Sequence, residues 1–203
     1  MDLERVEREL KKRWIVPYRW GRRQSDEWDR RTNFIYTTYS FESLLRKSEG
    51  LNEDLKNYAL NRWYNFWSAK AVEHIFASHP LVTPNKNRYD KLVDFTIDDI
   101  PFDHKTSIFP RGFDRGLEYA KKHKEELIYW LYENQSQQGR KHLKNRLFVV
   151  LYGRSEEHWK LKAEISLIKM SVQEYLRRFD AKELSRIEVE KSEALSDILW
   201  VVK

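Results

Sequence analysis

Asp94, Asp103 and Lys105 are the residues of this chain whose types and spacing are best suited to chemistry. They belong to the segment Lys91–Ser107, which reads KLVDFTIDDIPFDHKTS. Carboxylate oxygens are hard ligands of the kind that Mg²⁺ prefers, and a lysine beside them would lie close to whatever the metal binds. The three side chains therefore predict a metal site, provided that the fold brings them together.

The segment alternates like a β-hairpin, and its register decides which side chains meet. A turn at residues 98–99 would place Phe95 opposite Phe102 and Asp94 opposite Asp103. Successive side chains of a strand point to opposite faces. The two Phe rings would then face the core, and the two carboxylates would share the other face.

The same alternation puts Lys105 on the face of Asp94 and Asp103, and the His104 ring on the opposite face. Like charges that oppose each other, with Cβ atoms about 5 Å apart, destabilise a hairpin and push one carboxylate towards protonation. A divalent cation between them would remove this conflict. The competing interpretation is a solvated hairpin face that carries an ordinary Asp–Lys pair.

Periodicity, caps and breakers predict the elements that position the hairpin. Before the hairpin they are an amphipathic helix at 2–13, an irregular arm of Arg and aromatic residues at 15–37, a helix from Ser40 to Lys47 ended by Gly50, and a long helix that Asn52 opens and Pro80 stops. The hairpin strands are 92–97 and 100–107. After them come a helix at 114–133, a buried strand at 147–152, a strand at 159–165, a helix opened by the capping box Ser171–Glu174, and a last strand at 198–202.

This order predicts an α/β fold with a mixed sheet. The strand at 147 should run parallel to the one at 100, because a helix connects them. We expect a single domain over residues 1–203, with an N-terminal helical and aromatic arm at 1–50 and the core at 51–203.

Residues 53 to 152 resemble the PD-(D/E)XK nuclease superfamily, which has the restriction-endonuclease-like fold. The core of that family is a helix, a β-hairpin with the acidic residue and the (D/E)-x-K motif, a crossover helix and a buried parallel strand. Asp94 matches the first acid, and Asp103 and Lys105 match the motif. Val93 replaces the proline of the family's name, and Asp90 is a competing first acid.

The resemblance implies Mg²⁺-dependent hydrolysis of phosphodiester bonds, with Mn²⁺ as a substitute metal. Asp94 and Asp103 would hold the metal together with the His104 carbonyl, and Lys105 would stabilise phosphate charge and orient the attacking water. Family members often add a Glu from the preceding helix, which makes Glu73 an outer or second-metal ligand. The alternative for Glu73 is a boundary residue that pairs with Lys70.

Basic and polar residues outside the motif are candidates for contacts with a nucleic-acid backbone. Ordinary solvated surface is the competing interpretation of each cluster. The candidates are Arg111 and Arg115 before the crossover helix, Gln138, Arg140, Lys141, Lys144 and Arg146 in the loop before the buried strand, and Arg22 and Arg23 of the arm, which also holds Arg19, Tyr18 and Trp20.

Composition narrows the function classes without deciding among them. The chain has 38 Lys and Arg against 32 Asp and Glu, a net charge of +6, and no cysteine, so thiol catalysis is excluded. No apolar run long enough to cross a bilayer and no secretory leader is visible, so we expect a cytoplasmic protein that does not bind membranes. The six His residues lack close metal-binding spacing, and no glycine-rich phosphate loop appears.

The resemblance implies an endonuclease that acts on DNA rather than RNA, in restriction or defence. Cleavage of both strands would favour a homodimer. The alternative is a catalytically inactive module that binds nucleic acid or protein on the same fold. A structural or toxin–antitoxin-like partner is a third class, for which the residues offer no specific sign.

Overall fold

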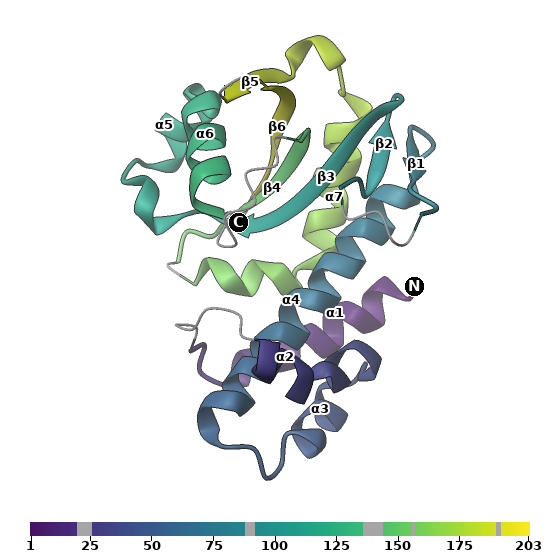
Figure 1. Ribbon diagram of the computed structural model, residues 1–203, viewed down its shortest axis with the longest axis vertical. Helices are drawn as coiled ribbons and strands as arrows, with labels where there is room; N and C mark the ends of the chain where they lie inside the picture. Colours follow the sequence, from purple (N-terminus) through teal and green to yellow (C-terminus); the bar gives the residue numbers. More distant parts are fainter. Residues whose placement is uncertain (20–25, 88–91, 136–143, 156, 190–191) are drawn as a thin grey trace.

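The described part of the chain forms a six-stranded mixed sheet with helices on both faces, next to a helical region that contains the N-terminus (Figure 1). The computed structural model describes residues 1–19, 26–87, 92–135, 144–155, 157–189 and 192–203. The strands lie in the order β1-β2-β3-β4-β6-β5. The predicted α/β class with a mixed sheet is confirmed.

The central strand β4 (Arg146–Tyr152) explains the unbroken apolar run of the sequence. Its odd-numbered residues, such as Val149, pack into the core beneath α4 and α7, and its even-numbered residues, such as Phe148, pack under α5 and α6. It pairs in parallel with β3 (Ile100–Ile108) on one side and with β6 (Ser192–Val202) on the other. A parallel strand covered on both faces must be apolar at successive positions.

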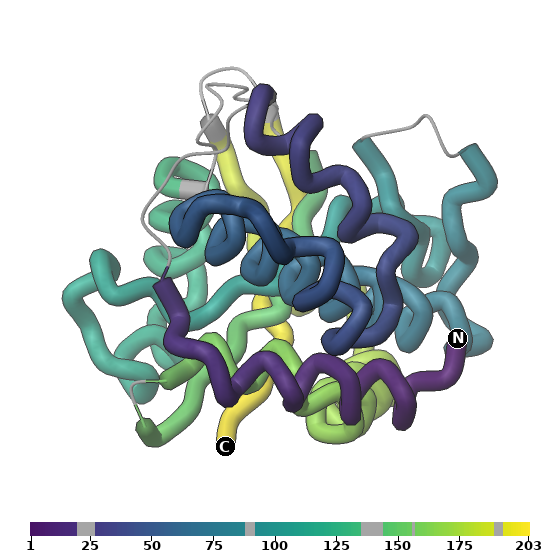
Figure 2. Tube along the Cα trace, turned by 90° about the horizontal axis from the view of Figure 1, so that it is seen from below, coloured from purple at the N-terminus to yellow at the C-terminus, as the bar shows by residue number. Residues whose placement is uncertain are grey.

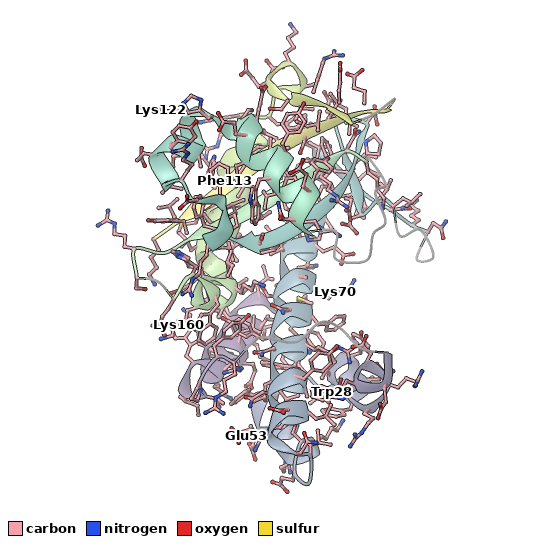
Figure 3. The ribbon with its side chains drawn as sticks, turned by 60° about the vertical axis from the view of Figure 1, so that its left-hand side comes forward. Trp28, Glu53, Lys70, Phe113, Lys122 and Lys160 are labelled. Atoms are coloured by element: carbon pink, nitrogen blue, oxygen red, sulfur yellow. The ribbon has the colours of Figure 1, made fainter. Side chains whose placement is uncertain are left out.

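The longest element is α4 (Glu53–Ala77), which runs from the helical region to the sheet. Asn52 caps it by accepting a hydrogen bond from the Leu55 N–H (2.9 Å), as its sequence predicts. Figure 3 shows Glu53 near the end that is far from the sheet and Lys70 further along the helix towards it.

Short helices fill the N-terminal region. Asp2 caps α1, and Ser40 caps α3 as expected from the sequence. α1 lies beside α7 (Figure 2). The prediction of an irregular arm is wrong for residues 26–37, which form helical turns held by rings that pack against α4, such as Trp28 on Tyr58. The elements are α1 (Leu3–Lys12), η1 (Arg13–Ile15), α2 (Asp26–Arg31), η2 (Asn33–Thr37) and α3 (Phe41–Lys47).

The hairpin has the predicted register where its two strands pair. β2 (Phe95–Ile97) is antiparallel to β3, with Phe95 opposite Phe102. The turn residues Asp98 and Asp99 have φ values of 49° and 61°, as a two-residue hairpin turn of the primed type requires. An additional strand, β1 (Val82–Pro84), pairs with β2 and was not predicted, because it is three residues long and ends in proline.

The crossover from β3 to β4 is helical but is not one helix. It consists of η3 (Arg111–Phe113), α5 (Leu117–Lys122) and α6 (Lys124–Gln135), and the two α-helices are separated at His123, whose φ of −125° and ψ of 53° are not helical. The predicted parallel pairing of the flanking strands is confirmed, with Lys105 opposite Phe148.

The C-terminal third departs most from the sequence prediction. Residues 159–165 were predicted as a strand, but η4 (His158–Ala163) is a 3₁₀ helix wedged between α1, α4 and β4. Helix α7 (Ile165–Arg177) begins six residues before the predicted capping box, so Ser171 lies inside it and its hydroxyl bonds the Leu167 carbonyl. The remaining elements are η5 (Ala181–Glu183) and β5 (Ser185–Val189), which pairs with β6. Within the described ranges, no helix is both long and apolar enough to cross a bilayer.

Candidate functional site

The candidate site lies where one edge of β3 is left open. β2 covers only the first three residues of β3, whereas β4 pairs with its other edge from Asp103 to Ile108. In that pairing the Asp103 N–H bonds the Asn145 carbonyl (3.0 Å) and the Phe109 N–H bonds the Leu151 carbonyl (2.9 Å). The N–H of His104 therefore points to the opposite, open edge, where it donates to Asp94 Oδ2 (2.8 Å).

Asp94 and His104 form a pair that the sequence did not predict. The Asp94 N–H donates to the Phe102 carbonyl (2.8 Å), although Phe102 is already opposite Phe95. Two residues thus share one partner, as in a β-bulge, and Asp94 does not lie opposite Asp103. Its Oδ2 is instead 2.8 Å from His104 Nδ1. The prediction that the His104 ring points away from the site is wrong.

The environment of Asp94 keeps its carboxyl group ionised. Burial by itself raises the pKa of Asp94, but two hydrogen bonds and the charge of His104, with a contribution from Lys105, outweigh it and lower the pKa below its usual value. The His104 ring is held against the Phe95 ring, with centroids 5.7 Å apart. An oriented carboxylate therefore faces the open edge of β3.

Asp103 lies in a different set of contacts. Its Oδ1 is 2.9 Å from Lys105 Nζ and its Oδ2 is 3.2 Å from Arg146 Nε. The Arg146 guanidinium in turn lies over the Tyr132 ring, 5.0 Å from its centroid. Asp103 is 4% exposed, so both of its oxygens are buried against cations. The expected direct opposition of two carboxylates is replaced by two separately neutralised acids.

A cavity of about 590 Å³ between α4, β3 and η4 brings several of the predicted residues together. Asp94, Lys105 and Glu73 all line it, together with His104, and Asp103 does not. The cavity also contains residues that the sequence did not single out, Thr106 and Lys162 among them. The full lining is Asn65, Ser68, Ala69, Glu73, Asp94, His104, Lys105, Thr106 and Lys162.

Glu73 satisfies both interpretations that the sequence left open. It pairs with Lys70 across one turn of α4, with Glu73 Oε2 2.6 Å from Lys70 Nζ. It also lines the cavity that holds Asp94. Its carboxylate is thus available at the site without being buried alone.

The residues fit a Mg²⁺ ion in part. Mg²⁺ takes oxygen ligands in octahedral geometry, and the carboxylates of Asp94 and Glu73 supply such oxygens within one cavity, beside the main chain of His104. Asp103 does not fit as a ligand in this arrangement, because Lys105 and Arg146 occupy its two oxygens. Over the described ranges, no three acidic, His or Cys side chains are grouped closely enough to hold a metal ion.

The predicted nucleic-acid contacts lie away from the cavity or outside the described ranges. Arg146 is a correction, since its side chain is 11% exposed and is engaged by Asp103. Arg115 is exposed and stacks over the Tyr119 ring, and Arg111 and Lys144 do not line the cavity. The candidates that lie outside the described residues are Arg22, Arg23, Gln138, Arg140 and Lys141, and the same holds for Trp20 and Asp90.

Comparisons of the chain with family models, with characterised proteins and with solved structures give no match. What the chain does must therefore be inferred from its own residues.

Proposed function

We propose that this chain is a Mg²⁺-dependent nuclease of the PD-(D/E)XK type that hydrolyses phosphodiester bonds, in DNA rather than RNA. The observation that carries the proposal is the cavity at the open edge of β3. Side chains from three separate elements meet there, Asp94 before β2, Lys105 on β3 and Glu73 on α4. Two carboxylates can hold a metal ion that neutralises phosphate charge and activates a water, and a nearby lysine can stabilise the same charge.

The order of the elements supports the same proposal. A long helix precedes an antiparallel hairpin, helices cross over, and a buried strand returns parallel to β3. This is the order that the resemblance implies for residues 53 to 152. The basic net charge of +6 is compatible with a polyanionic partner.

The chain's own residues have separable tasks in this proposal. Lys105, 46% exposed along its side chain, presents an ammonium group that stabilises charge on the phosphate. Asp103 forms a 2.9 Å ion pair with that ammonium group and does not line the cavity, so it is a positioning residue. His104 orients the Asp94 carboxylate with two hydrogen bonds to Oδ2.

Mg²⁺ would be held by Asp94 and Glu73 with the main-chain oxygen of His104, and it would neutralise phosphate charge and activate a water. We also propose that restriction or defence is the setting, and that cleavage of both strands uses a homodimer. Each protomer would then contribute one cavity of this kind.

A second candidate is a module that binds nucleic acid without cleaving it. The observation that favours it is the engagement of Asp103 by two cations, which leaves Asp94 and Glu73 as the acids of the cavity. The two candidates differ in one measurable property, the appearance of cleaved strands.

The test is incubation of plasmid DNA, single-stranded DNA and RNA with the protein in Mg²⁺, in Mn²⁺ and in EDTA. We expect cleavage that needs a divalent cation and falls at least about a hundredfold in Asp94→Asn and in Lys105→Met. Lys122→Met on α5, an exposed lysine at the far side of the molecule (Figure 3), is the matched control and should cleave like wild type. Cleavage that persists in EDTA or in both site variants would refute the proposal, and binding without cleavage would establish the second candidate.

A further inference from the structure

Lys162 is a lysine of the cavity that the motif does not include. It lies on η4, 57 residues after Lys105 in the chain, and it lines the same cavity as Asp94 and His104. Its Nζ donates a hydrogen bond to Asn65 Oδ1 (2.7 Å). The residue as a whole is half-buried.

The acids around Lys162 already have partners. Asp94 pairs with His104, and Glu73 pairs with Lys70 on α4. Asp103 on β3 pairs with both Lys105 and Arg146 of β4.

On α1, which also packs against η4, Glu7 pairs with Lys11, and Glu164 after η4 pairs with Lys11 and Lys203. Among the ion pairs of the described residues, none includes Lys162. Its ammonium group is therefore surrounded by protein with one neutral hydrogen-bond partner.

A buried ammonium without a counter-ion is unfavourable, and this lowers the pKa of the group. Burial lowers the pKa of Lys162 to about 8 from its ordinary value of 10.5. Natural chains keep buried charges paired, so a lone buried lysine at a cavity wall indicates an anion that is bound there part of the time.

Thr106 adds an unused polar group to the same cavity. Its Oγ1 is buried and has no hydrogen-bond partner within the described part of the chain. Lys105 and Lys162 line the same cavity as Thr106. The Thr106 hydroxyl and the ammonium groups of Lys105 and Lys162, each of which has N–H donors beyond the one used on Asp103 or Asn65, suit the oxygens of a tetrahedral anion.

We propose that Lys162 is a second phosphate-binding cation, which acts with Lys105 and the Thr106 hydroxyl to hold a phosphate group of the nucleic-acid backbone in this cavity. The identity of the anion as a nucleic-acid phosphate rests on the proposed nuclease function, whereas the anion site itself does not. Binding of the anion would supply the missing counter-ion and draw a proton onto Lys162.

Proton uptake gives the proposal a signature in pH. Below about pH 8 the ammonium is already charged and the anion binds without cost. Above it, binding must also protonate Lys162, so affinity should fall up to about tenfold per pH unit. Glu73, Asp94, His104 and Lys105 face the same cavity, so the signature must be shown to depend on Lys162 itself.

The experiment is calorimetric titration in EDTA with two probes, sodium sulfate and a short oligothymidylate, from about pH 7 to about pH 9.5. Sulfate keeps its charge over the whole range, so a change in its affinity belongs to the protein, and the oligothymidylate is compared below about pH 9, where its bases stay neutral. For wild type we expect the affinity for sulfate to fall about fivefold between about pH 8 and pH 9. Lys162→Gln should bind about tenfold more weakly at pH 7 and lose the pH dependence, and Lys162→Arg should keep its affinity at pH 9, because a guanidinium stays charged.

Lys160→Gln is the matched control, since Lys160 lies on the same 3₁₀ helix, pairs with Glu157 and does not line the cavity. It should behave as wild type. Equal sulfate affinity of Lys162→Gln and wild type at pH 7 would overturn the proposal. If the Lys162 variants fail to fold, the NMR titration of the wild-type Lys162 ammonium decides instead: its pKa should rise when sulfate is added, and an unchanged pKa overturns the proposal.

The two probes separate this inference from the proposed function. Sulfate binding that depends on Lys162, without binding or cleavage of oligonucleotides, would support the anion site and refute the nuclease. Cleavage in Mg²⁺ that is the same in Lys162→Gln and in wild type would support the nuclease and refute the role of Lys162.

Discussion

Replacement of Lys162 by Met should make the protein more stable at neutral pH, although it removes a hydrogen bond. The pKa of Lys162 falls from 10.5 to about 8 on folding. Each unit of pKa is worth about 1.4 kcal/mol, so the buried ammonium destabilises the folded state by about 3 kcal/mol at pH 7. Met fills nearly the same volume without the charge. Loss of the hydrogen bond to Asn65 Oδ1 lowers the free energy of unfolding by about 1 kcal/mol, so the variant should be more stable than wild type by about 2 kcal/mol.

The sign of this gain depends on pH. The pKa of Lys162 is lower in the folded than in the unfolded chain, so the penalty is complete below about pH 8, where both states carry the proton. Between about pH 8 and pH 10.5 the unfolded chain binds more protons, and the wild type gains stability relative to the variant. Above about pH 10.5 the penalty is gone, and Lys162→Met should be less stable than wild type by about 1 kcal/mol.

Urea unfolding at about pH 7 and at about pH 10.5 measures both values. In a separate thermal unfolding experiment at neutral pH, the variant's melting temperature should rise by about 4–8 °C for a chain of this length. Lys160→Met is the control, because Lys160 lies at the surface beside Glu157 and should change stability by less than about 1 kcal/mol. A destabilised Lys162→Met protein at pH 7 would refute the reasoning, since it would mean that the ammonium has an acidic partner.

Three further predictions concern the hairpin and its neighbours. Asp103→Leu should lower the free energy of unfolding, measured in urea, by about 3–5 kcal/mol, because it leaves Arg146 buried and unpaired. The double variant Asp103→Leu/Arg146→Met should recover most of this loss. A loss below about 1 kcal/mol in the single variant would contradict the buried ion pair. The lowered pKa of Asp94 stabilises the fold above about pH 4, and this contribution is lost as the pH falls through the lower folded-state pKa, so Asp94→Asn should lose less stability than wild type on acidification. NMR titration of Asp94 in wild type and in His104→Phe checks the cause, and a pKa of Asp94 that is not lowered in wild type would count against it. Asp99→Gly should stabilise the turn by about 0.5 kcal/mol, because Asp99 has a φ of 61°, and a loss of stability in urea would argue against the primed turn.

The elements with strong local signals were predictable from the sequence. Asn52 and Ser40 mark helix starts because their side chains satisfy N–H groups that have no partner in the helix. The apolar run 147–152 and the register of Phe95 with Phe102 follow from the requirement to bury apolar side chains. These signals depend on residues that are near in the chain or on a single face.

The site was less predictable because long-range contacts decide its details. The Asp94 N–H bonds the Phe102 carbonyl, so the Asp94 carboxylate lies beside His104 and not opposite Asp103. The residue pattern of the hairpin alone does not show this. Arg146 was read as a ligand for DNA, but its proximity to Asp103 depends on the parallel pairing of β3 with β4.

Lys162 was hidden by an incorrect assignment of its segment. Trp159, Leu161 and Ala163 alternate with lysines, which is typical of a half-buried strand and would place Lys162 in solvent. The segment is instead a 3₁₀ helix enclosed on several sides, and Tyr18 stacks on Trp159 with ring centroids 4.7 Å apart. Contacts with other elements place Lys162 in the cavity, and the periodicity of the sequence does not report such contacts.

Helix α4 makes the two halves of the molecule mechanically inseparable. Its 25 residues extend about 37 Å, and residues 58–64 are all buried, because helices of the N-terminal region and η4 pack around them. Further along, Phe76 stacks on Phe95 of the hairpin. A fragment that began at residue 51 would expose the enclosed stretch to water, and a fragment without the sheet would expose the far end. Unfolding should therefore be a single cooperative transition, and proteolysis should not release a stable core.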